Sequence, residues 1–349
     1  MKKTLLTICL VWMCFSLSAQ KIIDLSGKWS FSIDRQDNGE KEKWFSHTLN
    51  DFINLPGSMP EKLKGDEVTA KTQWTGSLYD SSYYYNPYME KYRKEGNIKF
   101  PFFLTPDKHY VGAAWYQKEV NIPADWKGER ILLFLERPHI ETTVWVNGQK
   151  TGMQNSLCVP HQYDITHYVR PGKCTITIRV DNRIKEINVG PDSHSITDQT
   201  QGNWNGIVGR ICLQTTPKTY FDDIQIYPEP EQKLARVKVV IKGTGTAKVK
   251  LSAESFNTDK KHIVPAIQQE IKLNKGVTET EMVLPMGNDM LLWDEFHPAL
   301  YKLKAEVTNG KKTEIKEIQF GMRRFEIKGK WFYVNGRKTQ LRGTVENCD

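Results

Sequence analysis

The stretch "ERILLFLERPHIETTVWVNGQKTG", residues 129–152, decides the fold class of this chain. Ile131, Leu133 and Leu135 recur at every second position, which places them on one face of a β-strand. The run from Thr143 to Val146 continues with β-branched and aromatic residues and leads into Asn147-Gly148. A type I′ turn needs positive φ at both central residues, and Asn-Gly tolerates this best. The stretch therefore predicts an antiparallel hairpin.

The same pattern extends in both directions along the chain. Residues 20–216 contain many short alternating runs separated by turn clusters, with almost no helical periodicity, and this suits a jelly-roll sandwich. Residues 217–322 repeat the pattern in "ARVKVVIK", "AKVKLSAE", "LYKLKAEVT" and "TEIKEIQF", which suits an immunoglobulin-like sandwich. "GTGT" at 243–246 lies between two of these runs and is interpreted as a hairpin turn.

The N-terminus has the organisation of a secretory signal peptide. A short basic region is followed by an apolar run from Leu5 to Leu17 and by the small residues Ser18-Ala19, so residues 1–19 are expected to be removed. The apolar run is short for a membrane span, and neither Cys9 nor Cys14 lies in a lipoprotein context. We expect a periplasmic or secreted protein without a membrane anchor.

Composition is that of an ordinary globular protein, with 39% hydrophobic and 26% charged residues. The formal net charge is +8, and Lys2 and Lys3 belong to the signal peptide. The remaining lysines mostly alternate with apolar residues, as in Tyr301-Lys302-Leu303-Lys304, which is typical of a solvated sheet face. Nucleic-acid binders cluster their basic residues, so nucleic acid is not expected as a partner.

Several blocks in order resemble glycoside hydrolase family 2, the family of β-galactosidases, β-glucuronidases and β-mannosidases. The blocks are "LSGKWSFSID" (25–34), "NLPGS" (54–58), "WYQKEVNIPADWKGERILLFLERPHIETTVWVNGQKTG" (115–152), "YDITHYV" (163–169), "GIVGRICL" (206–213), "LLWDEFHPALYKLKAEV" (291–307) and "FGMRRFEIKGKWFYVNGRKTQLRG" (320–343). The resemblance implies an all-β arrangement of a jelly-roll sugar-binding domain and an immunoglobulin-like sandwich. Residues 323–349 would then be the start of a truncated (β/α)8 barrel, with "LRG" (341–343) as its first strand.

The resemblance implies a function in the hydrolysis of terminal β-linked sugars by a secreted, retaining, β-galactosidase-like exo-glycosidase. Such enzymes use two carboxylates about 5 Å apart. The family's two glutamates lie on later barrel strands, so we expect them beyond residue 349 and expect the chain alone to be inactive. Asp294-Glu295 cannot replace them, because neighbouring residues of an extended segment point to opposite faces. No catalytic residue, metal site or cofactor is therefore predicted within the chain.

Two regions are candidates for contact with an oligo- or polysaccharide substrate. The loop "DQTQGNWNGIVGR" (198–210) resembles the one by which the family's jelly-roll reaches the barrel, and Asp198, Asn203 and Trp204 are its candidates. The alternative is that Trp204 fills a domain interface while the polar residues bond turn backbone. The tyrosine-rich stretch "LYDSSYYYNPYMEKY" (78–92) is either an accessory sugar subsite or a surface loop ordered by its own aromatic residues.

The last residues bear on the substrate pocket. Many family members place a histidine after "LRG", whereas "TVENCD" follows here, so Glu346 and Asn347 are further candidates for substrate binding. An alternative function is a non-catalytic carbohydrate-binding or adhesion protein made of β-sandwiches. Another is a scaffold that shapes the enzyme without contacting sugar, and a homo-oligomer of the longer enzyme stays open.

Overall fold

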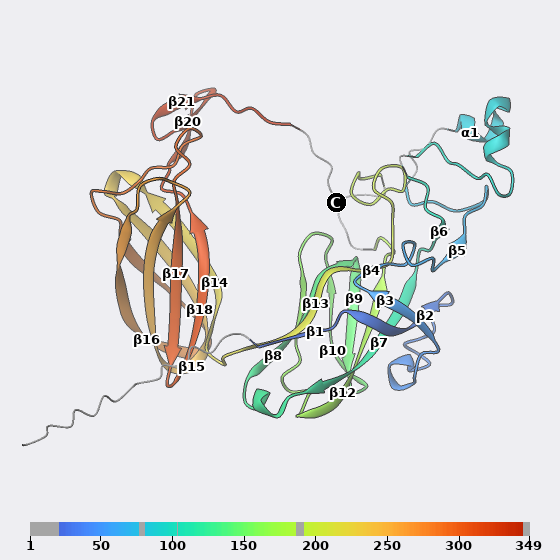
Figure 1. Ribbon diagram of the computed structural model, residues 1–349, viewed down its shortest axis with the longest axis horizontal. Helices are drawn as coiled ribbons and strands as arrows, with labels where there is room; N and C mark the ends of the chain where they lie inside the picture. The colour runs from blue at the N-terminus through green and yellow to red at the C-terminus, as the bar shows by residue number, and fades with distance from the viewer. Residues whose placement is uncertain (1–20, 77–80, 103, 186–191, 345–349) are drawn as a thin grey trace, which may run out of the picture. The chain divides into compact units, whose positions relative to one another are not determined.

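The computed structural model describes residues 21–76, 81–102, 104–185 and 192–344. The chain divides into two compact units, Lys21–Thr216 and a second unit that begins at Pro217, and both are built of antiparallel strands (Figure 1). The expected all-β class, with a jelly-roll and an immunoglobulin-like domain, is confirmed. None of the helices in these residue ranges is long and apolar enough to cross a membrane. The predicted signal peptide lies outside the described residues.

The first unit is a sandwich of a five-stranded and a six-stranded sheet. The five-stranded sheet has the order β1 (Ile22–Asp24), β13 (Gly206–Thr216), β8 (Arg130–His139), β11 (His161–Asp164), with β4 (Gly57–Ser58) paired to β13. The six-stranded sheet has the order β10 (Gln149–Asn155), β9 (Glu141–Val146), β12 (Gly172–Asp181), β7 (Ala113–Ile122), β2 (Gly27–Asp34), β3 (Asp51–Leu55). Short elements complete the unit: η1 (Trp44–Ser46), β5 (Asp66–Glu67), α1 (Ser82–Tyr85), η2 (Pro87–Tyr92), β6 (Lys108–His109) and η3 (Ala124–Trp126).

The hairpin predicted from the sequence joins β9 to β10. Asn147 and Gly148 have φ values of 50° and 77°, and Gln149 pairs with Val146. Leu133 and Leu135 of β8 are fully buried in the core between the sheets, as are Val144 and Val146. Burying such a side chain contributes about 1.5–3 kcal/mol, so this local pattern also supplies the core that holds the two sheets together.

The second unit is one continuous five-stranded sheet in which two strands are 23 residues long. Its strands are β14 (Tyr220–Glu229), β15 (Leu234–Phe256), β16 (Ile263–Pro285), β17 (Leu300–Asn309) and β18 (Lys312–Phe320), with η4 (Pro230–Gln232) between β14 and β15. The first half of β15 pairs with β14 and its second half with β17, while β16 follows it along both.

The interpretation of 243–246 as a hairpin turn is wrong. Strand β15 runs through this segment, and its register against β16 shifts between Gly243 and Gly245, opposite Gly276. A bulge lets a strand bend, and glycine suits it because a Cβ on Gly243 would lie 2.5 Å from Thr219 Oγ1. Local pattern cannot separate such a bend from a turn, because both interrupt the alternation with glycines.

The predicted alternation in β17 is confirmed. Tyr301, Leu303 and Ala305 are buried in the core, whereas Lys302 and Lys304 face outward, near Glu317 and Glu306 respectively.

After β18 comes a small three-stranded sheet of β19 (Phe325–Lys328), β20 (Trp331–Val334) and β21 (Arg337–Thr339). Its second turn is at Asn335-Gly336, where the φ values of 51° and 78° suit the Asn-Gly pair. Residues 341–343 pair with no strand among those the structure describes. Their role as a first barrel strand stays a prediction, because such a strand pairs only with its barrel neighbours.

Candidate functional site

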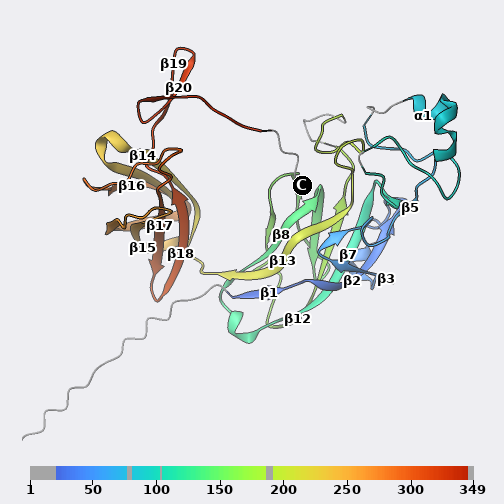
Figure 2. The ribbon, with the colours of Figure 1, turned by 45° about the horizontal axis from the view of Figure 1, so that its top comes forward.

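The candidate site is the long loop that joins β12 to β13, whose described part is residues 182–185 and 192–205. It lies at the end of the jelly-roll from which β5, β6 and α1 also extend (Figures 1 and 2). Three of the predicted sugar-contacting residues, Asp198, Asn203 and Trp204, are on this loop, and the structure brings them together. Glu346 and Asn347 lie outside the described residues.

Asp198 is buried, with 3% of its surface exposed, and its carboxylate ties the loop to the segment beneath it. One oxygen accepts the Thr75 backbone N–H at 2.6 Å and lies 3.2 Å from His109 Nε2. The other oxygen accepts the Asn203 backbone N–H at 2.7 Å. Both oxygens are therefore engaged within the protein, and the carboxylate closes the turn that presents Trp204.

Asparagine side chains clamp the loop on both sides of Trp204. Asn203 donates to Thr75 Oγ1 at 2.9 Å and to the Asn182 carbonyl at 3.0 Å, and it accepts a bond from the Asn182 side chain at 3.0 Å. Asn205 accepts from the Tyr116 hydroxyl at 2.8 Å and donates to the Gly112 and Val180 carbonyls. Buried amides whose N–H and C=O groups are all hydrogen-bonded fix the backbone of the loop. Trp204 is therefore held between two rigid positions, Asn203 and Asn205.

The Trp204 ring stacks on His139 at the end of β8, with ring centroids 4.5 Å apart and an angle of 21° between the planes. We call this stacked pair the Trp204 platform. His139 is 5% exposed, whereas Trp204 is half-buried. Burial lowers the pKa of His139 to about 4, although Asn203 and Asp198 oppose this shift, so the imidazole is neutral at physiological pH. Its Nε2 has no hydrogen-bond partner among the described residues.

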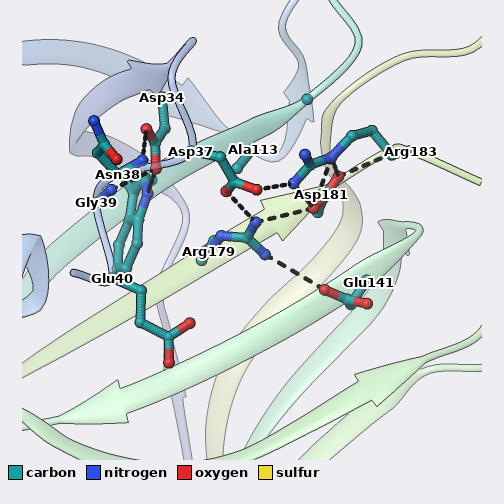
Figure 3. Close-up of polar contacts among 12 residues, drawn as sticks. Asp34, Asp37, Asn38, Gly39, Glu40, Ala113, Glu141, Arg179, Asp181 and Arg183 are labelled. Atoms are coloured by element: carbon teal, nitrogen blue, oxygen red, sulfur yellow. Dashed lines mark hydrogen bonds and ion pairs between the residues drawn. The ribbon is translucent and has the colours of Figure 1, made fainter. Parts of the chain in front are cut away.

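A buried charge network fixes the strand end from which the loop departs (Figure 3). Arg179, 7% exposed, lies 2.7 Å from Asp37, 3.0 Å from Asp181 and 3.4 Å from Glu141. Asp181 is fully buried and also bonds Arg183, the second residue beyond β12. Burial disfavours its charge, but hydrogen bonds from Arg183 and from Lys185 outweigh this and hold the pKa of Asp181 well below 3.8. The network joins the ends of β9 and β12 to the turn after β2.

That turn is folded onto the network by Asp34. One Asp34 oxygen accepts the Trp115 indole N–H and the Gly39 backbone N–H, each at 2.9 Å, and the other accepts the Asn38 backbone N–H at 2.9 Å (Figure 3). Gly39 is pressed against Trp115, since a Cβ there would lie 2.5 Å from the indole nitrogen. The turn thereby covers the outward face of β12, and Arg179 and Asp181 become buried.

The pair Asp294-Glu295 does not lie on the extended segment expected from the sequence: residues 295–297 form a bend, in which the Asp294 backbone N–H donates to the His297 carbonyl at 3.1 Å. Asp294 accepts the backbone N–H groups of Phe296 and His297, each at 2.8 Å, while Glu295 pairs with Arg337 at 2.7 Å. The two carboxylates thus serve different partners. Within the described ranges, no group of three or more His, Cys, Asp or Glu side chains is placed to hold a metal ion.

Sequence reasoning missed Asn182, Asn205, His139 and the charge network. The only local sign was that "NWN" (203–205) places amides on both sides of the tryptophan. His139 comes from β8, and Asn182 begins the loop 21 residues before Asn203, so only the sheet topology brings these residues together.

Comparison with known proteins gives consistent matches. Residues 22–217 match the family described as "Glycosyl hydrolases family 2, sugar binding domain", and residues 219–323 match "Glycosyl hydrolases family 2". A β-glucuronidase of Paenibacillus borealis is 24% identical over 350 residues, which cover 95% of this chain and 50% of the relative. The β-galactosidase large subunit of Latilactobacillus sakei is 24% identical over 328 residues, or 91% and 49% of the two chains.

Among solved structures, β-glucuronidase from Ruminococcus gnavus in complex with a C6-substituted uronic isofagomine superposes with a TM-score of 0.62 at 19% identity. The superposition covers 93% of this chain and 49% of the β-glucuronidase chain. At this identity the likeness supports the fold alone. The chain spans about half the length of these relatives.

Proposed function

Because the chain belongs to glycoside hydrolase family 2, we propose that it is the sugar-binding, N-terminal part of a retaining exo-β-glycosidase. Both matched regions belong to that family, which confirms the resemblance to it, while the seventh block (320–343) extends beyond the matched residues. The relatives named above are a β-glucuronidase and a β-galactosidase. The proposed substrate is accordingly a terminal β-linked galactoside or glucuronide, and the proposed place of action is the periplasm or the exterior, on account of residues 1–19.

The Trp204 platform is the observation that carries sugar binding. An indole ring held flat and partly exposed offers an apolar surface, and the C–H face of a pyranose is complementary to such a surface. The His139 stack and the two asparagine clamps fix the ring before a ligand arrives. Preorganisation of this kind lowers the entropy lost on binding.

Asp198 and Asn203 take part in this proposal by holding Trp204 in place. Their polar atoms are engaged with Thr75, His109 and Asn182. Direct bonds to sugar hydroxyls would require one of these contacts to be exchanged, and they stay a prediction.

Hydrolysis is proposed for the whole protein. Retention of configuration requires two carboxylates about 5 Å apart, one as nucleophile and one as acid and base. We propose that these lie outside residues 1–349, so the chain alone binds the sugar without cleaving it.

The test is isothermal titration of the chain with methyl β-D-galactoside and methyl β-D-glucuronide. We expect measurable binding of at least one glycoside, weakened about tenfold or more by Trp204→Ala. Trp331→Ala is the matched control, because Trp331 is 43% exposed in the other unit and should not contribute. Equal affinity of wild type and Trp204→Ala, or binding of neither glycoside, would contradict the proposal.

A further inference from the structure

The segment of residues 81–102 carries exposed aromatic side chains that do not pack into its own core. The core of this segment is Tyr83, which is 1% exposed and stacks on Phe100 with ring centroids 4.5 Å apart. The Phe100 ring in turn meets the edge of Trp74, with ring centroids 4.8 Å apart. The Tyr83 hydroxyl donates to the Tyr92 carbonyl at 2.8 Å. By contrast, Tyr85 and Tyr88 are 73% and 86% exposed.

The backbone fixes where these two rings are presented. Asn86 ends α1 and accepts the Tyr88 N–H at 3.0 Å through its side chain, and Pro87 begins η2. A 3₁₀-helix has three residues per turn, so Tyr88 and Lys91 lie on the same face of η2. The segment projects from the loop-bearing end of the jelly-roll, beyond β5 and β6 (Figures 1 and 2).

Two lysine side chains lie close to the aromatic rings of this segment. Lys91 and Lys99 both approach the Tyr92 ring, with their Nζ atoms 4.8 Å and 6.0 Å from its centroid. Neither lysine has an ion-pair partner among the residues the structure describes, whereas Lys94 of the same segment pairs with Glu90. Two lysine charges are thus free to meet an external anion beside exposed tyrosines.

We propose that Tyr85, Tyr88, Lys91, Tyr92 and Lys99, here called the tyrosine–lysine patch, bind an acidic polysaccharide. The tyrosines stack on pyranose faces, and the lysines neutralise carboxylate or sulfate groups on the chain. The inference rests on the proposed function, since it adds a second contact region to a sugar-binding chain. The unpaired charges favour an acidic over a neutral glycan.

A hollow of about 840 Å³ lies beside the patch, between Lys99 and the segment 67–70. This is within the usual range for ligand sites. Its lining also includes the carboxylates of Glu67, Glu95 and Asp107, so the anionic groups of the glycan are expected on the Tyr92 side.

The test measures binding of the full chain to polygalacturonate, to neutral dextran and to a single-stranded DNA oligonucleotide. We expect polygalacturonate to bind best, with an affinity that falls as salt is raised because the contacts are partly ionic. Tyr88→Ala and the double variant Lys91→Gln/Lys99→Gln should each weaken binding about tenfold. The controls are Tyr227→Ala, at a tyrosine 50% exposed in the other unit, and Lys218→Gln/Lys311→Gln, at two exposed lysines.

The inference would be overturned if the controls weakened binding as much as the patch variants, if DNA bound as tightly as polygalacturonate, or if polygalacturonate bound no better than dextran. Circular dichroism spectra that match the wild type would show that the variants are folded. The methyl glycosides separate this inference from the proposed function. If Trp204→Ala abolishes their binding while the patch variants leave polygalacturonate binding unchanged, the inference alone fails. If neither methyl glycosides nor polysaccharides bind, both fail.

Discussion

Replacing Arg179 with methionine removes the central cation of the charge network beneath the candidate site. Methionine keeps much of the volume of the arginine stem, so the change isolates the charge and its hydrogen bonds. Arg179 contacts Asp37, Asp181 and Glu141, and it is 7% exposed.

Removing one partner of a buried ion pair costs about 3–5 kcal/mol. Arg183 and Lys185 still face Asp181, and Lys185 also faces Glu141, so part of the negative charge stays compensated. We therefore expect the lower end, about 3 kcal/mol. For a unit of this size that corresponds to a fall in Tm of about 6–12 °C.

The assay is differential scanning calorimetry at neutral pH, following the transition of the Lys21–Thr216 unit. Arg35→Met is the matched control, because Arg35 and Asp66 form an ion pair with both side chains more than half exposed. Such pairs contribute about 0–1 kcal/mol. A Tm for Arg179→Met no lower than that of Arg35→Met would refute the network's role in holding the loop-bearing end together.

Other predictions concern pH, packing and thiol chemistry. The folded-state pKa of Asp181 is depressed, so its stabilisation is present above 3.8 and is lost as pH falls below that value. Denaturant unfolding should show a deficit for Asp181→Asn that is constant above about pH 5 and shrinks at lower pH; a deficit independent of pH would contradict this. Gly39→Ala should lower the free energy of unfolding by about 1–3 kcal/mol, because its methyl group meets the buried Trp115; a wild-type Tm would refute the contact. Burial raises the pKa of Cys174 to about 11, whereas Cys158 is exposed, so maleimide should label Cys158 before Cys174, as peptide mass spectrometry can check.

The features that could be predicted from sequence are those set by neighbours along the chain. The turns at Asn147-Gly148 and Asn335-Gly336 require positive φ, and Asn and Gly are the residue types that adopt it most readily. The alternation of β17 likewise follows from one buried and one solvated face. Each such signal is contained within a short stretch of the chain, so the fold class and the hairpins could be predicted from the sequence.

The features that were missed depend on distant segments. Arg179 and Asp181 alternate with buried Ile178 and Val180, so the sequence alone places them on a solvated face. They are buried because the turn after β2, some 140 residues earlier in the chain, folds over them. The Trp204 platform also needs His139 from another strand, and residue types within the loop cannot reveal this partner.

The most direct test of sugar binding at the loop is to observe the Trp204 indole itself. The chain has ten tryptophans, so ¹⁵N-tryptophan labelling gives few indole N–H resonances, and Trp204→Phe assigns the one of interest. On addition of methyl β-D-galactoside or methyl β-D-glucuronide, our account predicts that the Trp204 resonance shifts while that of Trp331 stays in place. An unmoved Trp204 resonance in the presence of saturating sugar, or shifts confined to other tryptophans, would contradict it.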